Sequence, residues 1–502
     1  MLLFLLAFTN QSLSQDFDGY ALYNLQNENT SYLIDKDGNI AHSWSCSVAC
    51  NYTVLLMETG NIMRGGVYSS NVLTGAAVGG MVQEIDPDGN VVWEFIYSNS
   101  EHCSHHDITL LPNGNVLLTA WEVKTEAECT AAGVDGVSTD QWPTHIIEVE
   151  QDGSGGQIVW EWHIWDHMIQ DVDNTKDNFG IIADHPELMD INLVSVSGGG
   201  GGGPGGGGPG GGGGDWFHVN GLDYNSTLDQ IVFSSRFTSE IYIIDHSTTT
   251  AAAATHAGGN SGMGGDFLYR WGNPANYGST GSQTIASAVH DPRWIDAGRP
   301  NAGYIQFFNN EGGSGNSSVV DAINPPVDGY NYTMTGASYG PTNYEWRHEC
   351  EANSTGQSAS NRMSNGNTFV NVSGEYMYEV DDQDNIVWQY NAGPTKAFRY
   401  ECDFPGISTL LGEDPCGLST IDENDNAISV YPNPSKGDLI INGLPAADSD
   451  IEIKVFDIQG NLILNIVNEN TISLGGQAEG LYFMSVMIDG QEIFTKKIAL
   501  IK

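Results

Sequence analysis

The most regular feature of the chain is a repeated pattern in roughly its first four hundred residues. A short strand of alternating apolar and polar residues is followed by a turn of Asp, Gly and Asn, and then by a strand that contains Trp. The copies are LIDKDGNIAHSW (33–44), EIDPDGNVVWEF (84–95), EVEQDGSGGQIVWEW (148–162), EVDDQDNIVWQY (379–390) and a degenerate copy from IIDHS to FLYRWG (243–272). The pattern predicts an antiparallel hairpin at each copy.

A second set of strand pairs alternates with the first. These pairs are VLLMETGNIMRGG (54–66), HHDITLLPNGNVLLTAW (105–121), VNGLDYNSTLDQIVFSSR (219–236), HDPRWIDAGRPNAGYIQFFNN (290–310) and SNRMSNGNTFVNV (360–372). Two hairpins in series form a four-stranded antiparallel sheet, and sheets of this size bury their faces by stacking radially as propeller blades. We therefore predict an all-β, six-bladed β-propeller over residues 18–410, closed by pairing its first strands (20–46) with its last (397–409).

Several segments depart from the repeat. Residues 160–193 are too irregular for a hairpin and predict a long ordered loop or short helices. Residues 198–214 are almost pure Gly, which cannot bury apolar surface, and predict a mobile loop within the propeller. Residues 411–427 predict a linker, and a new strand pattern over 428–502 predicts a small C-terminal β-sandwich of six or seven strands.

The C-terminal segment carries motifs of its own. They are YPNP (431–434), FDIQGN (456–461), GLY (480–482) and a basic end at Lys496, Lys497 and Lys502. These residues closely resemble the C-terminal sorting domain of the type IX secretion system. The resemblance implies that residues 428–502 are an export address read by the type IX machinery, and that the protein is secreted or held at the cell surface. The apolar run MLLFLLAFTNQSLS (1–14) agrees, since it predicts a secretory signal peptide.

Charge narrows the class of partner. The chain has 502 residues and a formal net charge of −46, so we expect it to bind neither nucleic acid nor an anionic membrane surface. No stretch is long and apolar enough to predict a transmembrane segment. Only 17 Lys and Arg residues occur, so an Arg inside a motif is a candidate for holding an anionic substrate or, equally, for pairing with a carboxylate. These candidates are Arg236, Arg293, Arg347 and Arg362.

The seven cysteines of an exported chain permit disulfides. The expected pairs are Cys46 with Cys50, Cys103 with Cys129 and Cys350 with Cys402, which leaves Cys416 over. A zinc site is the alternative, but no CxxC spacing occurs, so we expect no cysteine-bound metal and no cofactor.

Histidines recur at one position of the repeat. His106, His218 and His290 each begin a hairpin. Equivalent positions at the start of the innermost strands of a propeller point at the central channel, so these side chains are expected to meet on one axis. Imidazole suits nucleophilic attack and proton transfer near neutral pH. The alternatives are a structural His that satisfies a neighbouring carbonyl, and a metal site that also uses Asp107 and Asp291.

The propeller resembles the PAPS-independent arylsulfotransferases. The resemblance rests on HHDITLLPNGNVLLTAWE (105–122), IVWEWHIWDHMIQDVDNTKDNFG (158–180), ADHPELMDIN (183–192), DWFHVNGLDYNSTLDQIVFSSRFTSEIYIIDHS (215–247), LYRWGNP (268–274), VHDPRW (289–294), FFNN (307–310) and SNRMSNGNTFV (360–370). Such enzymes move a sulfuryl group from a phenolic sulfate ester to a phenol acceptor through a sulfohistidine on a six-bladed propeller.

The resemblance implies roles for individual residues. It implicates His218, Asn220 and Arg236 in one unit, and His290 with Asn310 in another. Together with His106, the predicted catalytic residues are His218, His290 and Arg236, and the predicted substrate-binding residues are Asn220, Asn310 and Arg362. The nucleophile is left open among His218, His290 and His348.

These residue types suit the chemistry of sulfuryl transfer. The reaction places charge on the peripheral oxygens of the sulfuryl group, which guanidinium and imidazolium donors stabilise, and Arg can contact two sulfate oxygens at once.

Two alternatives accompany the predicted aryl-sulfate sulfotransferase. Relatives often carry an Arg just past the FFNN motif, whereas this chain continues EGGSGNSS (311–318), so a non-catalytic carbohydrate-binding or adhesive propeller is one alternative. The other is a metal-dependent hydrolase, or a propeller that binds calcium through DVDNTKD (171–177), although acidic Asp/Gly segments are commonly just turns.

Overall fold

The computed structural model describes residues 18–194, 214–412, 415–416, 429–433, 435–444, 451–488 and 491–501. It divides into two compact units, Met1–Cys416 and Gly417–Lys502. The predicted signal peptide (1–14), all but the last residue of the Gly-rich segment (198–214) and most of the predicted linker (411–427) lie outside the described residues.

The described residues of the first unit form six four-stranded antiparallel sheets, the arrangement of a propeller. The first three sheets comprise β30 (Ala397–Glu401) with β1 (Gly19–Asn24), β2 (Thr30–Ile34) and β3 (Ile40–Ser45); β4 (Cys50–Leu56), β5 (Ile62–Val67), β6 (Gly80–Ile85) and β7 (Val91–Ile96); and β8 (His102–Leu110), β9 (Val116–Glu122), β10 (Thr144–Asp152) and β11 (Gly155–His163). The other three comprise β14 (Val219–Asn225), β15 (Gln230–Ser235), β16 (Glu240–Asp245) and β17 (Tyr269–Trp271); β18 (Val289–Trp294), β19 (Ile305–Asn309), β20 (Val319–Ile323) and β25 (Trp346–Glu349); and β26 (Ala359–Arg362), β27 (Thr368–Val372), β28 (Tyr376–Val380) and β29 (Ile386–Tyr390).

The repeated turn and the repeated Trp explain why these sheets form. In the first copy, Oδ1 of Asp35 accepts hydrogen bonds from the backbone N–H groups of Asp37 and Asn39, which fixes the hairpin. The same Asp-to-Asn contact recurs at Asp86 and Asp381, in the copies over 84–95 and 379–390. The Trp side chains of the copies are buried, and they are Trp44, Trp93, Trp162, Trp271 and Trp388. The confirmed all-β class therefore follows from the hydrophobic pattern.

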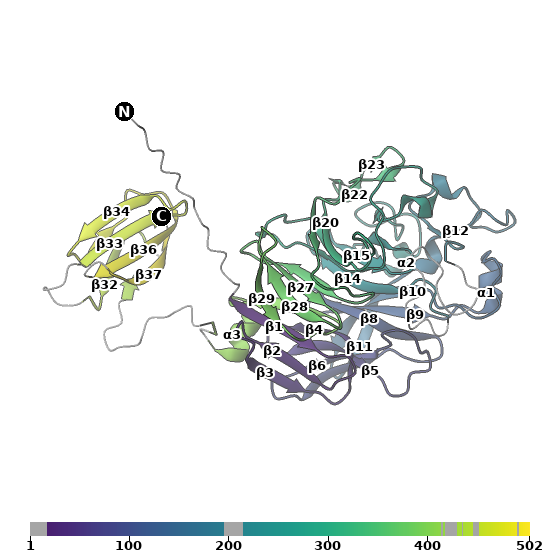
Figure 1. Cartoon of the computed structure of the whole chain (residues 1–502), viewed down its shortest axis with the longest axis horizontal. Helices are drawn as coiled ribbons and strands as arrows, with labels where there is room; N and C mark the ends of the chain where they lie inside the picture. Colours follow the sequence, from purple (N-terminus) through teal and green to yellow (C-terminus); the bar gives the residue numbers. More distant parts are fainter. Residues whose placement is uncertain are drawn as a thin grey trace. The chain divides into compact units, whose positions relative to one another are not determined.

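The chain closes the propeller on itself as predicted. Strand β1 pairs with β30, with Leu22 opposite Phe398, so the last strand completes the sheet that the first three begin. Figure 1 shows the purple N-terminal strands beside the green strands of the last sheet. Helix α3 (Pro405–Leu411) follows, and its Ile407 is buried in the core of the closing sheet.

The predicted cysteine pairs were wrong. The disulfide joins Cys402 and Cys416 across 14 residues, just beyond the closing strand, where α3 turns the chain back. The other cysteines are free, and they are Cys46, Cys50, Cys103, Cys129 and Cys350. Four of these five thiols are buried in the apolar interior, where Cys acts as a small hydrophobic residue.

The predicted irregular segment over 160–193 begins later than expected, because residues 160–163 end strand β11; the rest forms two short helices and two short strands. They are η1 (Ile164–His167), β12 (Met168–Ile169), η2 (Ile182–Asp184) and β13 (Met189–Asp190). Its apolar side chains, including Met168 and Met189, join the core of the adjacent sheets.

Other short elements of the first unit are α1 (Glu126–Ala131), α2 (Thr250–Ala253), η3 (Pro274–Tyr277), β21 (Val327–Asp328), β22 (Asn331–Tyr332), β23 (Met334–Thr335) and β24 (Ser338–Tyr339).

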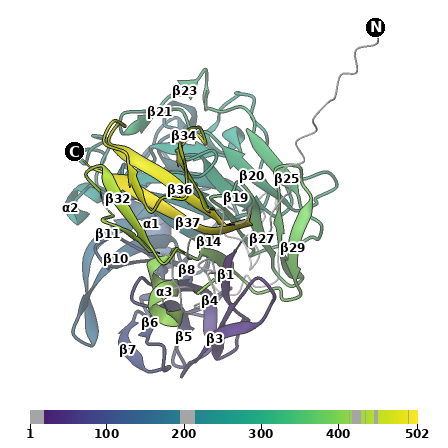
Figure 2. The same cartoon turned by 90° about the vertical axis from the view of Figure 1, so that its left-hand side faces the viewer.

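The second unit has two sheets around its own core, and its strands are coloured yellow-green in Figure 2. One sheet contains β31 (Ser429–Tyr431), β32 (Asp438–Asn442) and β35 (Thr471–Ser473), and the other contains β33 (Ile451–Asp457), β34 (Leu462–Val467), β36 (Gly480–Ile488) and β37 (Gln491–Leu500). These seven strands match the predicted small sandwich. Across both units, the described part of the chain holds no helix that is long and apolar enough to cross a membrane.

Candidate active site

The candidate site lies where the first strands of neighbouring sheets meet. Strand β8 contacts β4 and β14, and β14 in turn contacts β18, so these strands form the inner edge of the propeller. Each of them carries a β-bulge near its start, for example between Ser104 and Ile108 in β8. A bulge bends the strand and re-aims the side chains beside it. The inner strands therefore turn selected side chains toward the axis.

Positive backbone φ angles mark the same places. His106 has φ 49°, His218 has φ 52° and Asp291, next to His290, has φ 49°. A bulky residue avoids this region unless the surrounding structure imposes it, and such residues concentrate at functional sites. Sequence alone gives no sign of these bulges.

The side chains of His106, His218, His290 and Arg236 line one cavity of about 430 Å³. Phe237 and the loop over 354–357 form another part of its wall. All four of the named side chains are more than nine-tenths buried. Residues separated by up to 184 positions in the chain (290 − 106) are thus brought to one place, as the repeat pattern predicted.

His218 is held by a carboxylate. Its Nδ1 lies 2.6 Å from Oδ2 of Asp215, and its backbone N–H donates to Oδ1 of the same residue. Burial opposes ionisation of Asp215, but the adjacent imidazole of His218 outweighs it and lowers the pKa of this carboxyl. The His218 ring stacks on Phe237 with ring centroids 4.7 Å apart. Nδ1 is therefore the donor, and Nε2 is the nitrogen left to act as a base.

His290 is oriented by two oxygens. Its Nδ1 lies 2.9 Å from the backbone oxygen of Ala288 and 2.7 Å from Oδ1 of Asn310. Nδ1 therefore carries the proton, and the lone pair of a neutral ring resides on Nε2. Burial, followed by the charge of Arg236, lowers the pKa of His290 well below its usual value. Gly356 faces Nε2, and a side chain added there would come within 3.9 Å of this atom.

His106 completes the group of imidazoles. Its Nδ1 lies 2.8 Å from Nδ1 of His105, and its ring meets His218 edge-on with centroids 4.7 Å apart. Burial lowers the pKa of His106 well below its usual value, and the nearby histidines lower it further. Burial likewise lowers the pKa of His105 to about 3. Both rings are therefore neutral at physiological pH.

Arg236 supplies the positive charge of the cavity. Its Nη1 is buried and has no hydrogen-bond partner among the described residues. The backbone N–H of Arg236 donates to the backbone oxygen of His218, which keeps the two residues adjacent. Burial lowers the pKa of Arg236, against the charge of Glu311, but a guanidinium stays protonated in proteins. A buried guanidinium with free donors is a site for an oxyanion.

Asn220 and Asn310 lie behind the cavity wall. Asn220 Nδ2 donates to the backbone oxygen of Val289, so it fixes the residue before His290. Asn310 accepts from His290 and donates to the backbone oxygen of Ser354. Both residues were predicted to bind substrate, but the structure gives them contacts that position His290.

Two other candidates lie elsewhere. Arg362 lines a second cavity of about 90 Å³ with Arg293 and Asp223, because it ends β26 while the axial cavity lies at the start of that strand. His348 is on β25, at the outer edge of its sheet, and its nitrogens contact Asp384 and the hydroxyl of Tyr378. Neither Arg362 nor His348 therefore lines the axial cavity, and the predicted role of Arg362 in binding substrate stays a prediction.

A buried ionic network lies next to the histidines. Nζ of Lys396 lies 2.7 Å from Oδ2 of Asp107 and 2.8 Å from Oδ1 of Asp291. Burial opposes ionisation of Asp291, but Arg293 and Lys396 outweigh it and lower the pKa of its carboxyl. The carboxylate of Asp107 also accepts from the backbone N–H of Leu222, so the network ties three inner strands and the closing segment together.

Sequence reasoning missed several of these residues. Asp215 lies three positions before His218, and that spacing was a usable signal for a His–Asp pair. His105 was visible in the HHD motif but was not chosen. Lys396 and Gly356 gave no signal, because their roles depend on the closure of the propeller and on an irregular loop.

Fold and site together define a β-propeller with a histidine-lined cavity at its inner edge, in which the Nη1 atom of Arg236 has no hydrogen-bond partner among the described residues. The chain matches the arylsulfotransferase (ASST) family over residues 6–332 and the secretion system C-terminal sorting domain over residues 429–502. The first match covers more than half of the chain, which therefore belongs to the arylsulfotransferase family. The second marks it as cargo of the type IX secretion system, exported to the cell surface or beyond.

No curated protein matches the chain. Among solved structures, the chain is similar to a protein of unknown function from Bacteroides caccae. The two are 12% identical, the match covers 76% of this chain and 98% of the other, and the TM-score is 0.41. The periplasmic gluconolactonase PpgL of Pseudomonas aeruginosa is 9% identical, with coverages of 96% and 99% and a TM-score of 0.37.

Proposed function

We propose that the protein is an aryl-sulfate sulfotransferase that moves a sulfuryl group from a phenolic sulfate ester to a phenol acceptor through a sulfohistidine. The observation that carries the proposal is the convergence of His290, His218 and Arg236 on one cavity. A neutral imidazole, a carboxylate-paired imidazole and an unpaired guanidinium are the groups that this reaction needs.

His290 is the proposed nucleophile. Its proton is held on Nδ1 by Asn310 and Ala288, so the lone pair of Nε2 attacks sulfur. The N–S bond forms as the S–O bond to the donor phenol breaks, and the protonated His218 gives its Nε2 proton to the departing phenolate. The low pKa of His290 keeps it neutral and therefore nucleophilic.

His218 serves as the proton carrier in both steps. In the second step Nε2 of His218 takes the proton of the acceptor phenol, whose oxygen attacks sulfur while the N–S bond breaks and neutral His290 is restored. Asp215 holds the proton on Nδ1 of His218 and stabilises the imidazolium that forms. Atoms and charges balance over the two steps, and no nucleotide is required.

Arg236 is the proposed sulfate ligand. Its free Nη1 donates to the peripheral oxygens of the sulfuryl group, where charge accumulates in the loose transition state. His106 lies against His218 in the same wall and is proposed to position the substrate. No metal or cofactor enters this scheme.

A non-catalytic binding propeller is the second candidate. The observation that favours it is Glu311, which follows the FFNN motif and places a negative charge near Arg236. An anionic group there weakens the attraction of the cavity for a sulfate ester.

A transfer assay separates the two candidates. The full chain is incubated with a phenyl sulfate donor and a second phenol, and the new sulfate ester is measured by mass spectrometry. We expect transfer by the wild type and none by His290→Ala, with Asp384→Asn, beside His348, as a matched control that retains activity. Absence of both transfer and hydrolysis in the wild type would favour the binding propeller.

A further inference from the structure

A second group of titratable side chains lies outside the axial cavity. His167, His256 and Asp266 come from η1, from the loop after α2 and from the approach to β17, and their ligand atoms all lie within 4.8 Å of one another. We propose that these three residues bind a divalent transition metal ion, with zinc as the best fit. None of these three residues was a candidate from the sequence.

The contacts of the two ring nitrogens of His167 are those expected of a metal ligand. Its Nε2 lies 2.8 Å from the backbone oxygen of Ala253, which can only accept, so Nε2 carries the ring proton. Nδ1 then faces Oδ1 of Asp266, 2.8 Å away. A metal ion held between this nitrogen and this oxygen would take the place of the proton that otherwise joins them. A ligating His whose other nitrogen donates to a backbone carbonyl is the usual arrangement around protein-bound metals.

The same oxygen has a second nitrogen beside it. Nδ1 of His256 also lies 2.8 Å from Oδ1 of Asp266. Two imidazole nitrogens and one carboxylate form a donor set that suits zinc and related transition ions, whereas calcium and magnesium prefer oxygen ligands alone. A tetrahedral ion with ligands at about 2.1 Å separates them by about 3.4 Å, so binding requires each nitrogen to move about 0.6 Å away from the carboxylate oxygen.

The local fold holds two of the ligands and leaves the third free to make that shift. The side chain of His167 is fully buried and stacks on Trp162. Gly265, next to Asp266, lies so close to His167 that a Cβ there would come within 2.6 Å of Nε2. The side chain of His256, by contrast, is 62% exposed and can rotate.

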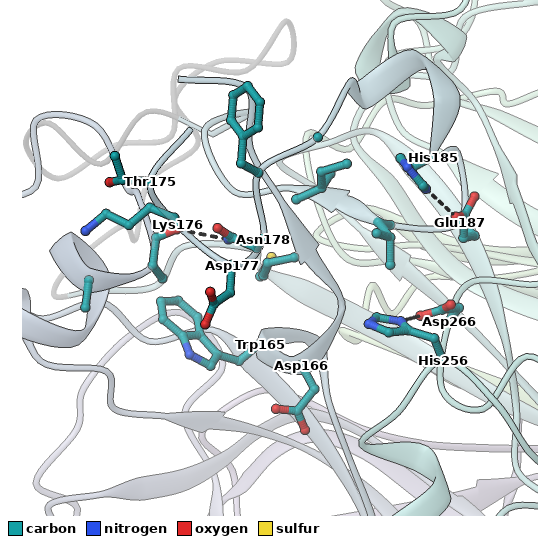
Figure 3. A pocket seen from close by; sticks show the side chains of 17 residues that line it. Trp165, Asp166, Thr175, Lys176, Asp177, Asn178, His185, Glu187, His256 and Asp266 are labelled. Carbon is teal, nitrogen blue, oxygen red and sulfur yellow. Dashed lines mark hydrogen bonds and ion pairs between the residues drawn. The ribbon is translucent and has the colours of Figure 1, made fainter. Parts of the chain in front are cut away.

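The site opens on a cavity of about 760 Å³, which His256 and Asp266 help to line. Figure 3 shows His256 and Asp266 together on one wall, with Trp165 and Lys176 facing them across the space. No residue lines both this cavity and the axial one. With three protein ligands, the ion keeps a coordination position for water or an oxygen ligand from the cavity, as in catalytic zinc sites.

Zinc binding by the full chain tests the proposal. The chelator-stripped protein is titrated with Zn²⁺ by calorimetry, and the retained metal is counted after gel filtration. We expect about one Zn²⁺ for each chain, and binding at least about 100-fold weaker in His256→Ala. The matched control is His185→Ala, since His185 lines the same cavity but pairs with Glu187.

Cobalt gives an independent readout. Co²⁺ in the wild type should show the visible absorption of a tetrahedral site, which His256→Ala should lose and His185→Ala should keep. Because His256 is largely exposed, its replacement should not prevent folding, and circular dichroism checks this. A wild type that retains no zinc, or equal losses in both variants, would overturn the proposal. Sulfuryl transfer does not involve these residues, so its presence or absence leaves this test unaffected.

Discussion

Nδ1 of His218 lies 2.6 Å from Oδ2 of Asp215, and this contact fixes which nitrogen of His218 faces the axial cavity. Asp215 is itself held by Nε1 of Trp121, so the pair is rigid. The chemistry assigned to the cavity depends on the tautomers that such contacts impose.

Replacement of Asp215 by Asn tests this relationship. The amide keeps the volume but allows the wrong tautomer of His218, so we expect kcat for transfer to fall by about 100-fold or more while the fold is kept. The control is Asp229→Asn, because Asp229 pairs with His246 away from the cavity. Steady-state kinetics at pH 7 give the comparison, and equal effects of the two variants would remove Asp215 from the mechanism.

Arg236→Lys should weaken donor use. A lysine keeps the charge but loses the second donor to sulfate, so we expect kcat/KM for the donor to fall by about 10-fold to 100-fold. Arg362→Lys provides the comparison, since Arg362 lines the other cavity and should leave transfer unchanged. If Arg362→Lys lowers kcat/KM as much as Arg236→Lys does, the assignment of the sulfate site is wrong.

The buried histidines predict loss of stability in mild acid. Burial lowers the pKa of His106, His145 and His290 well below the usual value, and that of His105 to about 3. Below pH 6.5 the unfolded chain binds protons that the folded chain does not, so the free energy of unfolding falls as the pH falls. The loss is about 2 kcal/mol for each such histidine at pH 5.

Urea unfolding at pH 7.5 and pH 5 measures this loss. His246 acts in the opposite direction: burial works against its charge, but Asp229 and Glu148 raise its pKa to about 9. Its stabilising effect is fully present at pH 5, so it offsets a small part of the loss. An unchanged free energy of unfolding between the two pH values would contradict the assignment of the buried histidines as neutral.

Lys396→Met should destabilise the propeller. It removes the cation shared by Asp107 and Asp291 and leaves buried carboxylates under-compensated, at a cost of about 3–5 kcal/mol. Lys36→Met is the control, because Lys36 forms an exposed pair with Asp18 and should change stability by less than about 1 kcal/mol. Thermal unfolding of the two variants checks the difference, and equal melting temperatures would show that the network contributes little.

The fold was largely predictable because its signals are local. The Asp-to-Asn turns and the buried Trp of each copy are set by residues a few positions apart, and the pairing of β1 with β30 follows from the need to close the ring. The disulfide was not predictable, because the pairing of Cys402 with Cys416 depends on how α3 returns the chain. The sequence carries no signal for that path.

The site was predictable only in part. The shared repeat position correctly predicted that His106, His218 and His290 lie together, since equivalent positions meet at the inner edge of the propeller. Arg362 lies in the other cavity, at the opposite end of its strand. Residue type does not indicate which end of a strand faces the axial cavity, so the sequence could not predict this. The bulges and positive φ angles that aim the side chains arise from packing between sheets and cannot be seen in the sequence.

Intact-mass analysis after treatment with donor in the absence of acceptor is the sharpest test of a sulfohistidine at His290. We expect a gain of one sulfuryl group, mapped by peptide sequencing to His290, and lost on addition of a phenol. Transfer activity without any modified intermediate, or a sulfuryl group mapped to another residue, would contradict it.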